Sequence, residues 1–221
     1  AEAVISFEHG DGTVQRRWFV SRENWLVMCR IKAQGGISFN ITAELHDTET
    51  FESEDLPEYE VICENGALKY AAENDDGTDF GAVIKLCKTD GATEYRGSFI
   101  HIENAEETVF AAGVFTSGRR IEDTERILKY IDECDTDYEK SLEKSAEMHR
   151  ELFQRCTFNL YDGEEHSDEE LLLDAYYSGE ASAELFEKLW AFGRYMFISG
   201  TGKYPFHLYG LWCGSYNPLW A

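Results

Sequence analysis

The chain has 221 residues, and with 43% hydrophobic and 14% aromatic content it can bury a sizeable core, which excludes global disorder. Its 43 acidic residues against 20 basic ones give a formal net charge of −23 at pH 7. Such a surface repels phosphate groups, so nucleic acid and anionic membranes are not expected partners. Neutral or cationic partners, sugars among them, remain open.

Residues 1–118 are predicted to form an antiparallel β-sandwich that is partial at its N-terminus. Short runs rich in β-branched and aromatic residues recur from VQRRWFVS to TVFAAGVFTS, with no helical period between them. Between the runs, glycine, asparagine and aspartate offer turns at HGDG (9–12), AQGG (33–36), ENG (64–66), NDDG (74–77) and KTDG (88–91). Regularly spaced strands of this kind favour a sandwich. The acidic segment 46–59 is expected to be a solvated loop.

Residues 119–162 are predicted to be a helical linker with a short strand. The first helix places Ile127, Leu128 and Ile131 on one face. The second helix is expected to begin at a cap formed by Asp135 or Thr136. Its apolar stripe contains Tyr138, Leu142, His149, Leu152 and Phe153. The alternating segment CTFNLY (156–161) predicts the short strand.

Residues 163–221 are predicted to be the truncated start of a helical domain. Ser167 and Glu170 have the spacing of a capping box before SDEELLLDAYY continues as a helix. A last helix, from about Ser182 to Ile198, carries only one charge after Lys188 and is apolar around nearly its whole circumference. A helix of this kind needs burial on all sides. We therefore interpret the chain as a fragment cut inside a helical domain, and we expect it to self-associate.

Few residues suggest chemistry by themselves. The six cysteines form no C-x-x-C pair, so no zinc or redox motif is indicated, and we interpret them as reduced and buried. NDDGTD lacks the ligand spacing of a calcium loop and is interpreted as a plain turn. His149 is interpreted as a core histidine and His166 as an exposed residue beside a helix cap. The residues predict no cofactor, no metal site and no catalytic set.

The order of four segments in the second half of the chain is informative. The segments are HRELFQRCTFNLY (149–161), LFEKLWAFGRYMFISGTG (185–202), PFHLYGLW (205–212) and NPLW (217–220). This order resembles the run that leads into the catalytic barrel of glycoside hydrolase family 95, which includes inverting α-L-fucosidases. Matching positions are Leu152, Phe153, Arg155, Gly193, Arg194, Tyr195, Ile198, Ser199, Pro205, Leu208, Gly210, Trp212, Pro218 and Trp220. Upstream, WFVSRENWLVMCRIKA (18–33) is similar to a sandwich segment of the family, with Arg22 and Arg30 in place.

The resemblance implies an antiparallel β-sandwich, linker helices and the first helix of an (α/α)6 barrel. It implies a parent enzyme that acts on an oligo- or polysaccharide, with one acid protonating the leaving oxygen and one base activating water. The family's acid and base lie further on than Trp220, so the chain is expected to hold no catalytic residue and to be inactive alone. His207 and Tyr209 stand where the family has Asn and Gln, and with Trp212 they are the predicted substrate-binding residues.

Two other classes of protein stay open at this point. One is a non-catalytic carbohydrate-binding or interaction β-sandwich module with a helical tail. The other is a scaffold whose apolar helix docks onto a separate chain. The localisation is unknown from sequence, although free cysteines favour a reducing compartment such as the cytoplasm.

Overall fold

The computed structural model describes residues 2–10, 12–44 and 57–202. It divides into two compact units, Ala1–Ala146 and Glu147–Ala221. The first unit holds the strands, the first helix and the start of the second helix. The second unit holds the rest of the second helix and two further helices. The predicted division at residues 118 and 162 stays a prediction.

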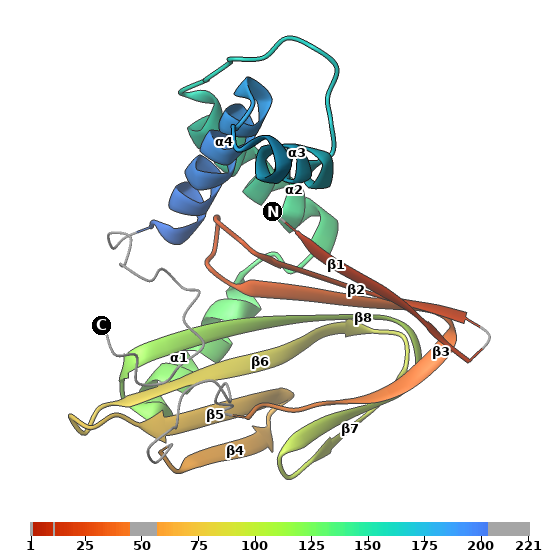
Figure 1. Ribbon diagram of the computed structural model, residues 1–221. Coiled ribbons are helices and arrows are strands. Elements are labelled where there is room, and N and C mark those ends of the chain that lie inside the picture. The colour runs from red at the N-terminus through yellow and green to blue at the C-terminus, as the bar shows by residue number, and fades with distance from the viewer. Residues whose placement is uncertain (1, 11, 45–56, 203–221) are drawn as a thin grey trace. The chain divides into compact units, whose positions relative to one another are not determined.

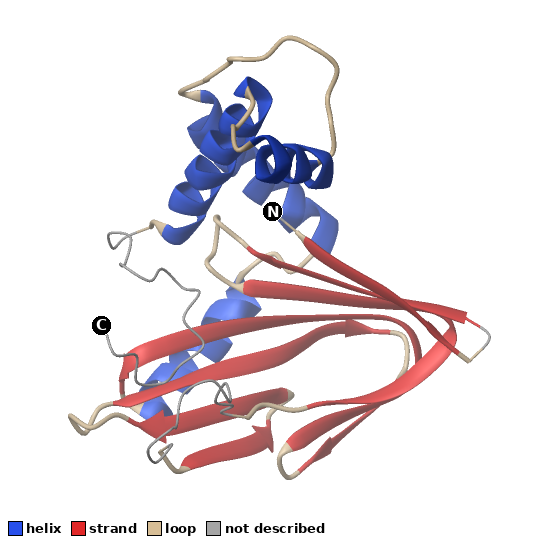
Figure 2. Ribbon diagram, viewed as in Figure 1, coloured by secondary structure: helices blue, strands red, loops and turns tan. Residues whose placement is uncertain are grey.

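The first unit is built on one antiparallel sheet of eight strands (Figures 1 and 2). Its strands are β1 (Ala3–His9), β2 (Gly12–Val20), β3 (Val27–Ile41), β4 (Tyr59–Glu64), β5 (Ala67–Glu73), β6 (Asp79–Thr89), β7 (Ala92–Arg96) and β8 (Phe99–Gly118). The strand order is β1-β2-β3-β8-β6-β5-β4, and β7 pairs with β8. The prediction of an antiparallel β region followed by helices is confirmed.

The long strands β3 and β8 bend, and the sheet curls over itself (Figure 1). In β3 the bend lies at Gly35 and Gly36, whose φ angles are 85° and 73°, and the register with β8 shifts between Lys32 and Ile37. A Cβ atom on Gly36 would lie 2.4 Å from Oδ1 of Asn104. The prediction of a turn between two strands at AQGG was therefore wrong. The glycines form a bulge that bends one continuous strand.

The predicted turns at ENG and NDDG are confirmed. Asn65 and Gly66 join β4 to β5 with φ angles of 52° and 76°, the left-handed pair that a tight hairpin needs. In the second turn, Oδ1 of Asp76 accepts a hydrogen bond from the backbone N–H of Thr78 at 2.9 Å. NDDG is thus held by a local side-chain bond of the kind that aspartate forms in turns.

Each face of the sheet buries its own apolar cluster. On one face Val83 and Ala111 pack against Ile127 and Ile131 of α1 (Arg120–Glu133). Phe110, the neighbour of Ala111 in β8, points to the opposite face because side chains alternate along a strand. There it joins Ile31, Ile41, Leu68, Ile100 and Ile102, which come from both arms of the curled sheet. The curl thereby gives one sheet the layered interior of a sandwich.

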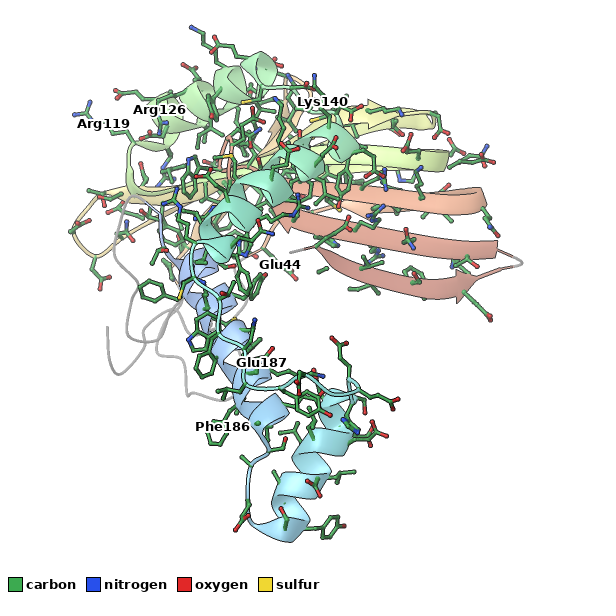
Figure 3. The ribbon with its side chains drawn as sticks, turned by 90° about the horizontal axis from the view of Figure 1, so that it is seen from above. Glu44, Arg119, Arg126, Lys140, Phe186 and Glu187 are labelled. Carbon is green, nitrogen blue, oxygen red and sulfur yellow. The ribbon has the colours of Figure 1, made fainter. Side chains whose placement is uncertain are left out.

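The predicted face of the first helix is confirmed, since Ile127 and Ile131 are buried and Leu128 packs against the same cluster. Figure 3 shows Arg119 and Arg126 at this helix. The cap of α2 (Tyr138–Gln154) differs from the prediction. Oδ1 of Asp137 accepts from the backbone N–H of Lys140 at 2.9 Å, so Asp137 caps the helix rather than Asp135 or Thr136.

The second unit contains the end of α2, α3 (Asp168–Ser178) and α4 (Ala183–Gly200). The capping box of Ser167 and Glu170 is confirmed, and Ser182 caps α4 by accepting from Leu185 N at 3.1 Å. The short strand predicted at 156–161 is absent from the structure. Within the described ranges, no helix is long and apolar enough to cross a membrane.

Candidate functional site

The three predicted substrate-binding residues, His207, Tyr209 and Trp212, lie outside the described residues. Their role stays a prediction. The described chain reaches the end of α4, only a few residues before them in the sequence. The part of the candidate site that the structure describes is therefore α4 and the contacts that fix it within the second unit.

Arg194 joins α4 to the C-terminal end of α2. Its Nε donates to the carbonyl oxygen of Phe153 at 3.0 Å, and its Nη2 donates to that of Leu152 at 2.7 Å. Both carbonyls belong to the last turn of α2, where a helix leaves its oxygens without intrahelical partners. The guanidinium charge also complements the negative end of the helix dipole. Arg194 therefore supplies the C-terminal cap that the sequence of α2 lacks.

Aromatic rings surround this arginine. The Arg194 guanidinium lies 5.7 Å from the ring centroids of both Phe153 and Trp190. His149 stacks on Phe153 at 6.1 Å and contacts Tyr195 at 5.3 Å between centroids. His149 is half-buried and packs on two rings, so it is not the fully buried core histidine of the prediction. These contacts give two of the matching segments, Leu152–Arg155 and Gly193–Tyr195, a shared structural role, because each supplies half of the α2–α4 junction.

Two side chains of α4 hold the segment that follows α2. The carboxylate of Glu187 accepts from the backbone N–H groups of Leu160 at 2.7 Å and Tyr161 at 3.1 Å. Phe158 packs on Trp190, with ring centroids 5.4 Å apart. A helix side chain thus satisfies amides that the predicted strand would have paired with a neighbouring strand. Figure 3 shows Glu187 on α4, with Phe186 projecting away from the helix.

A polar cluster joins the beginnings of α3 and α4. Glu184 is only 4% exposed, and its two oxygens accept from the backbone N–H and from Nδ1 of His166, each at 2.8 Å. Nζ of Lys188 lies 3.6 Å from Oε1 of Glu184 and donates to Asp168 at 3.2 Å. The side chain of His166 is 51% exposed. The prediction of an exposed histidine beside a cap is confirmed, but sequence reasoning missed its buried partner.

The protonation equilibria of this pair follow from its hydrogen bonds. The bond to Glu184 raises the pKa of His166 above its ordinary value. The bond from the His166 backbone N–H lowers the pKa of Glu184, and the histidine ring adds to this effect. The pair therefore favours an imidazolium facing a carboxylate.

The shifted carboxyl groups of the described residues share one direction. The pKa is lowered at Glu2, Asp76, Asp79, Asp90, Glu94, Glu107, Asp123, Asp135, Glu170 and Glu184. A general acid in glycoside hydrolysis needs the opposite shift, so that it keeps its proton near neutral pH. None of these ten carboxyl groups has the raised pKa of such an acid. Nor do three His, Cys, Asp or Glu side chains in the described ranges meet in a group that could hold a metal ion.

The five cysteines within the described ranges are free, but they do not share one environment. Cys29 is buried, whereas Cys156 is exposed. The interpretation of all cysteines as buried is confirmed at Cys29 and wrong at Cys156, while Cys63, Cys87 and Cys134 are half-buried. Cys156 lies two residues after the C-terminal end of α2, in the segment that joins α2 to α3.

Residues 137–221 match the family model described as the glycosyl hydrolase family 95 catalytic domain. No curated protein matches the chain. The matched range contains all of α2, α3 and α4, including Arg194 and the two carbonyls that it caps. Residues 137–221 are therefore part of a family 95 catalytic domain, as their motifs predicted. The similarity of residues 18–33 to the family's sandwich segment lies outside this range and stays a prediction.

Proposed function

We propose that this chain, which carries part of a family 95 catalytic domain, belongs to an enzyme that hydrolyses α-L-fucosides or related glycosides with inversion. In such a reaction a carboxylic acid gives its proton to the leaving oxygen as the glycosidic C–O bond breaks. A carboxylate on the opposite face of the sugar removes a proton from the attacking water. The substrate is an oligo- or polysaccharide.

The observation that carries this proposal is the family match over α2 to α4. The capping of α2 by Arg194 supports it, because it gives two matched motifs one physical purpose. In this proposal the described residues supply the scaffold and the first helix of an α/α-barrel. His207, Tyr209 and Trp212 would line the mouth of its pocket. The acid and the base would come from elsewhere in the parent enzyme, and residues 1–221 alone would not turn over substrate.

The test compares the product of the complete reading frame with the 221-residue chain. Both are assayed on p-nitrophenyl α-L-fucoside and on the corresponding galactosides, and proton NMR records which anomer forms first. We expect the complete protein to release β-L-fucose from the α-fucoside, and the 221-residue chain to release nothing above the buffer rate. Formation of the α-anomer first would refute inversion. Hydrolysis of galactoside but not fucoside would refute the fucosidase specificity and leave the reaction class standing.

The predicted site residues have their own test in the complete protein. His207→Asn restores the amide that the family carries at this position, and we expect it to change the ratio of kcat/KM values between fucoside and galactoside. Trp212→Ala should lower the melting temperature, since a buried tryptophan contributes about 3–5 kcal/mol when it is truncated. An unchanged sugar preference would remove His207 from the specificity site. Unchanged melting with lost turnover would make Trp212 a sugar-contacting residue instead.

A further inference from the structure

A hollow of about 270 Å³ opens on the face of the sheet that α1 does not cover. Trp18, Phe39 and Phe110 contribute aromatic walls, and Ile31 and Ile84 are among its aliphatic residues. Trp18 meets Phe110 edge to face, with centroids 5.5 Å apart and planes at 81°. The hollow therefore has a defined aromatic wall within the first unit.

Arg16 lies on the rim of this hollow and is exceptional among the basic residues around it. Its neighbours Arg17 and Arg30 each pair with a carboxylate, at 2.5 Å and 2.7 Å. Arg16 has no carboxylate partner among the described residues. Its guanidinium instead lies 5.2 Å from the ring centroid of Phe7. In a chain of net charge −23, an arginine without an acidic partner is a local positive site in an acidic surface.

The register of the sheet explains why no acid neutralises Arg16. Its cross-strand partners are Ile5 in β1 and Ile31 in β3, both apolar. Directly opposed residues share one face of the sheet. Burial raises the pKa of the Cys29 thiol to about 12, and the charge of Arg16 partly opposes this effect. Arg16 is therefore a positive group at the edge of an otherwise uncharged hollow.

These features select the chemistry of a ligand. The polar residues of its lining are Arg16, Asn40 and Thr42, and Oδ1 of Asn40 already lies 2.8 Å from Nδ1 of His101. A sugar carries hydroxyl groups around its whole ring, and most of them would face apolar side chains without a hydrogen bond, which is costly. A cation would be repelled by Arg16. A molecule with an apolar body and one carboxylate fits both parts, since a guanidinium binds a carboxylate through two parallel hydrogen bonds. We propose that this hollow binds a small amphiphilic carboxylate, with its acid group on Arg16 and its body against Trp18 and Phe39.

The test uses the 221-residue chain and three ligands of equal length: octanoate, octan-1-ol and octylammonium. Isothermal titration calorimetry should show octanoate binding about tenfold more tightly than octanol. A tenfold difference in affinity is what one hydrogen-bonded charge pair contributes to the binding free energy. Arg16→Gln should reduce the affinity for octanoate to that for octanol. Arg150→Gln is the matched control, because Arg150 is also exposed but lies on α2, and it should change nothing.

A second variant tests the hollow itself. Ala112 lines it, and Ala112→Leu should weaken octanoate and octanol together, with circular dichroism confirming that the sheet has formed. Equal affinities for octanoate and octanol would overturn the proposal, as would tighter binding of octylammonium. Equal losses from Arg16→Gln and Arg150→Gln would also overturn it, because the effect would then reflect net charge. The absence of binding by any of the three ligands at millimolar concentration would overturn it too.

Discussion

The sheet with α1 and the helix α4 are both strongly apolar, yet they differ in how completely that apolar surface is buried. In the sheet, Met28, Val83 and Ile102 are fully buried. In α4, Phe186, Phe192 and Phe197 are 54%, 60% and 59% exposed. The comparison teaches that hydrophobic content alone does not produce a core. Burial requires a second element whose apolar face has the matching shape.

The source of this difference lies in the pattern of each element. α1 has one apolar stripe and lays it on the sheet, leaving Ile121 in its first turn 71% exposed. α4 is apolar around most of its circumference, and only Leu185 and Ile198 are buried hydrophobic residues on it. Its packing partners among the described residues cover one side. The rest of its surface stays open to a further partner.

The largest expected effect on stability concerns the buried interface between α1 and the sheet. Ile131→Ala should destabilise the first unit by about 2–5 kcal/mol, because it leaves a cavity between α1 and the sheet. Ile121→Ala is the matched control on the same helix and should change the free energy of unfolding by less than about 0.5 kcal/mol. Urea denaturation monitored by circular dichroism measures both. Equal losses would show that α1 is not packed as the structure describes.

The second prediction concerns the exposed apolar face of α4. We propose that the 221-residue chain self-associates through the exposed face of α4, since monomers rarely tolerate large apolar patches. Phe192→Lys should weaken association by about tenfold or more in sedimentation velocity, the effect expected when a central apolar contact is lost. Val114→Lys is the control on the sheet, where Val114 is 65% exposed. A larger effect of Val114→Lys would move the association surface from α4 to the sheet.

Sequence reasoning succeeded where the signal is local. The capping box at Ser167 and Glu170 and the buried face of α1 depend on residues three or four positions apart. It failed where the deciding partner lies far along the chain. Gly35 and Gly36 have the composition of a turn, and only the approach of Asn104 makes them a bulge.

The α2–α4 junction shows the same limit of sequence reasoning, because its deciding contacts join residues that lie far apart along the chain. The alternation of residues 156–161 is real, but Glu187 satisfies the amides of Leu160 and Tyr161 from 26 or 27 positions away. Arg194 reaches carbonyls 41 and 42 positions earlier, and no periodicity connects residues at such distances. The resemblance to a family singled out Arg194, while its physical role needed the structure.

Arg194 provides the third prediction, which concerns the side of α4 that is covered. Arg194→Lys keeps the charge but loses the planar fork, so it cannot serve both carbonyls at once. We expect a loss of about 1–3 kcal/mol in the stability of the second unit and faster amide hydrogen exchange around the end of α2. Arg155→Lys is the control, because the pair of Arg155 with Glu151 is solvent-exposed and contributes little. Equal exchange rates in both variants would contradict the capping role.

The smallest expected effect is the pH dependence of the contact between α3 and α4. The pKa of His166 is raised in the folded state, so its stabilising contribution is complete below the unfolded value of about 6.5 and is lost as the pH rises through the higher folded value. The pKa of Glu184 is lowered, so its contribution is present above its ordinary value and is lost as the pH falls through the folded value. The charges of Lys188, Glu164 and Glu170 also act on the pair.

The pair is therefore expected to stabilise the second unit most in mildly acidic solution, between these two limits. Thermal melts from pH 4 to pH 9 should show a small decrease of Tm on the alkaline side that disappears in His166→Gln. The control is His149→Gln, because this ring packs on Phe153 and Tyr195, and we expect its loss to lower Tm at every pH. If the alkaline decrease persists in His166→Gln, the pH dependence belongs to another group. The ion pair would then contribute only its backbone hydrogen bond from His166 to Glu184.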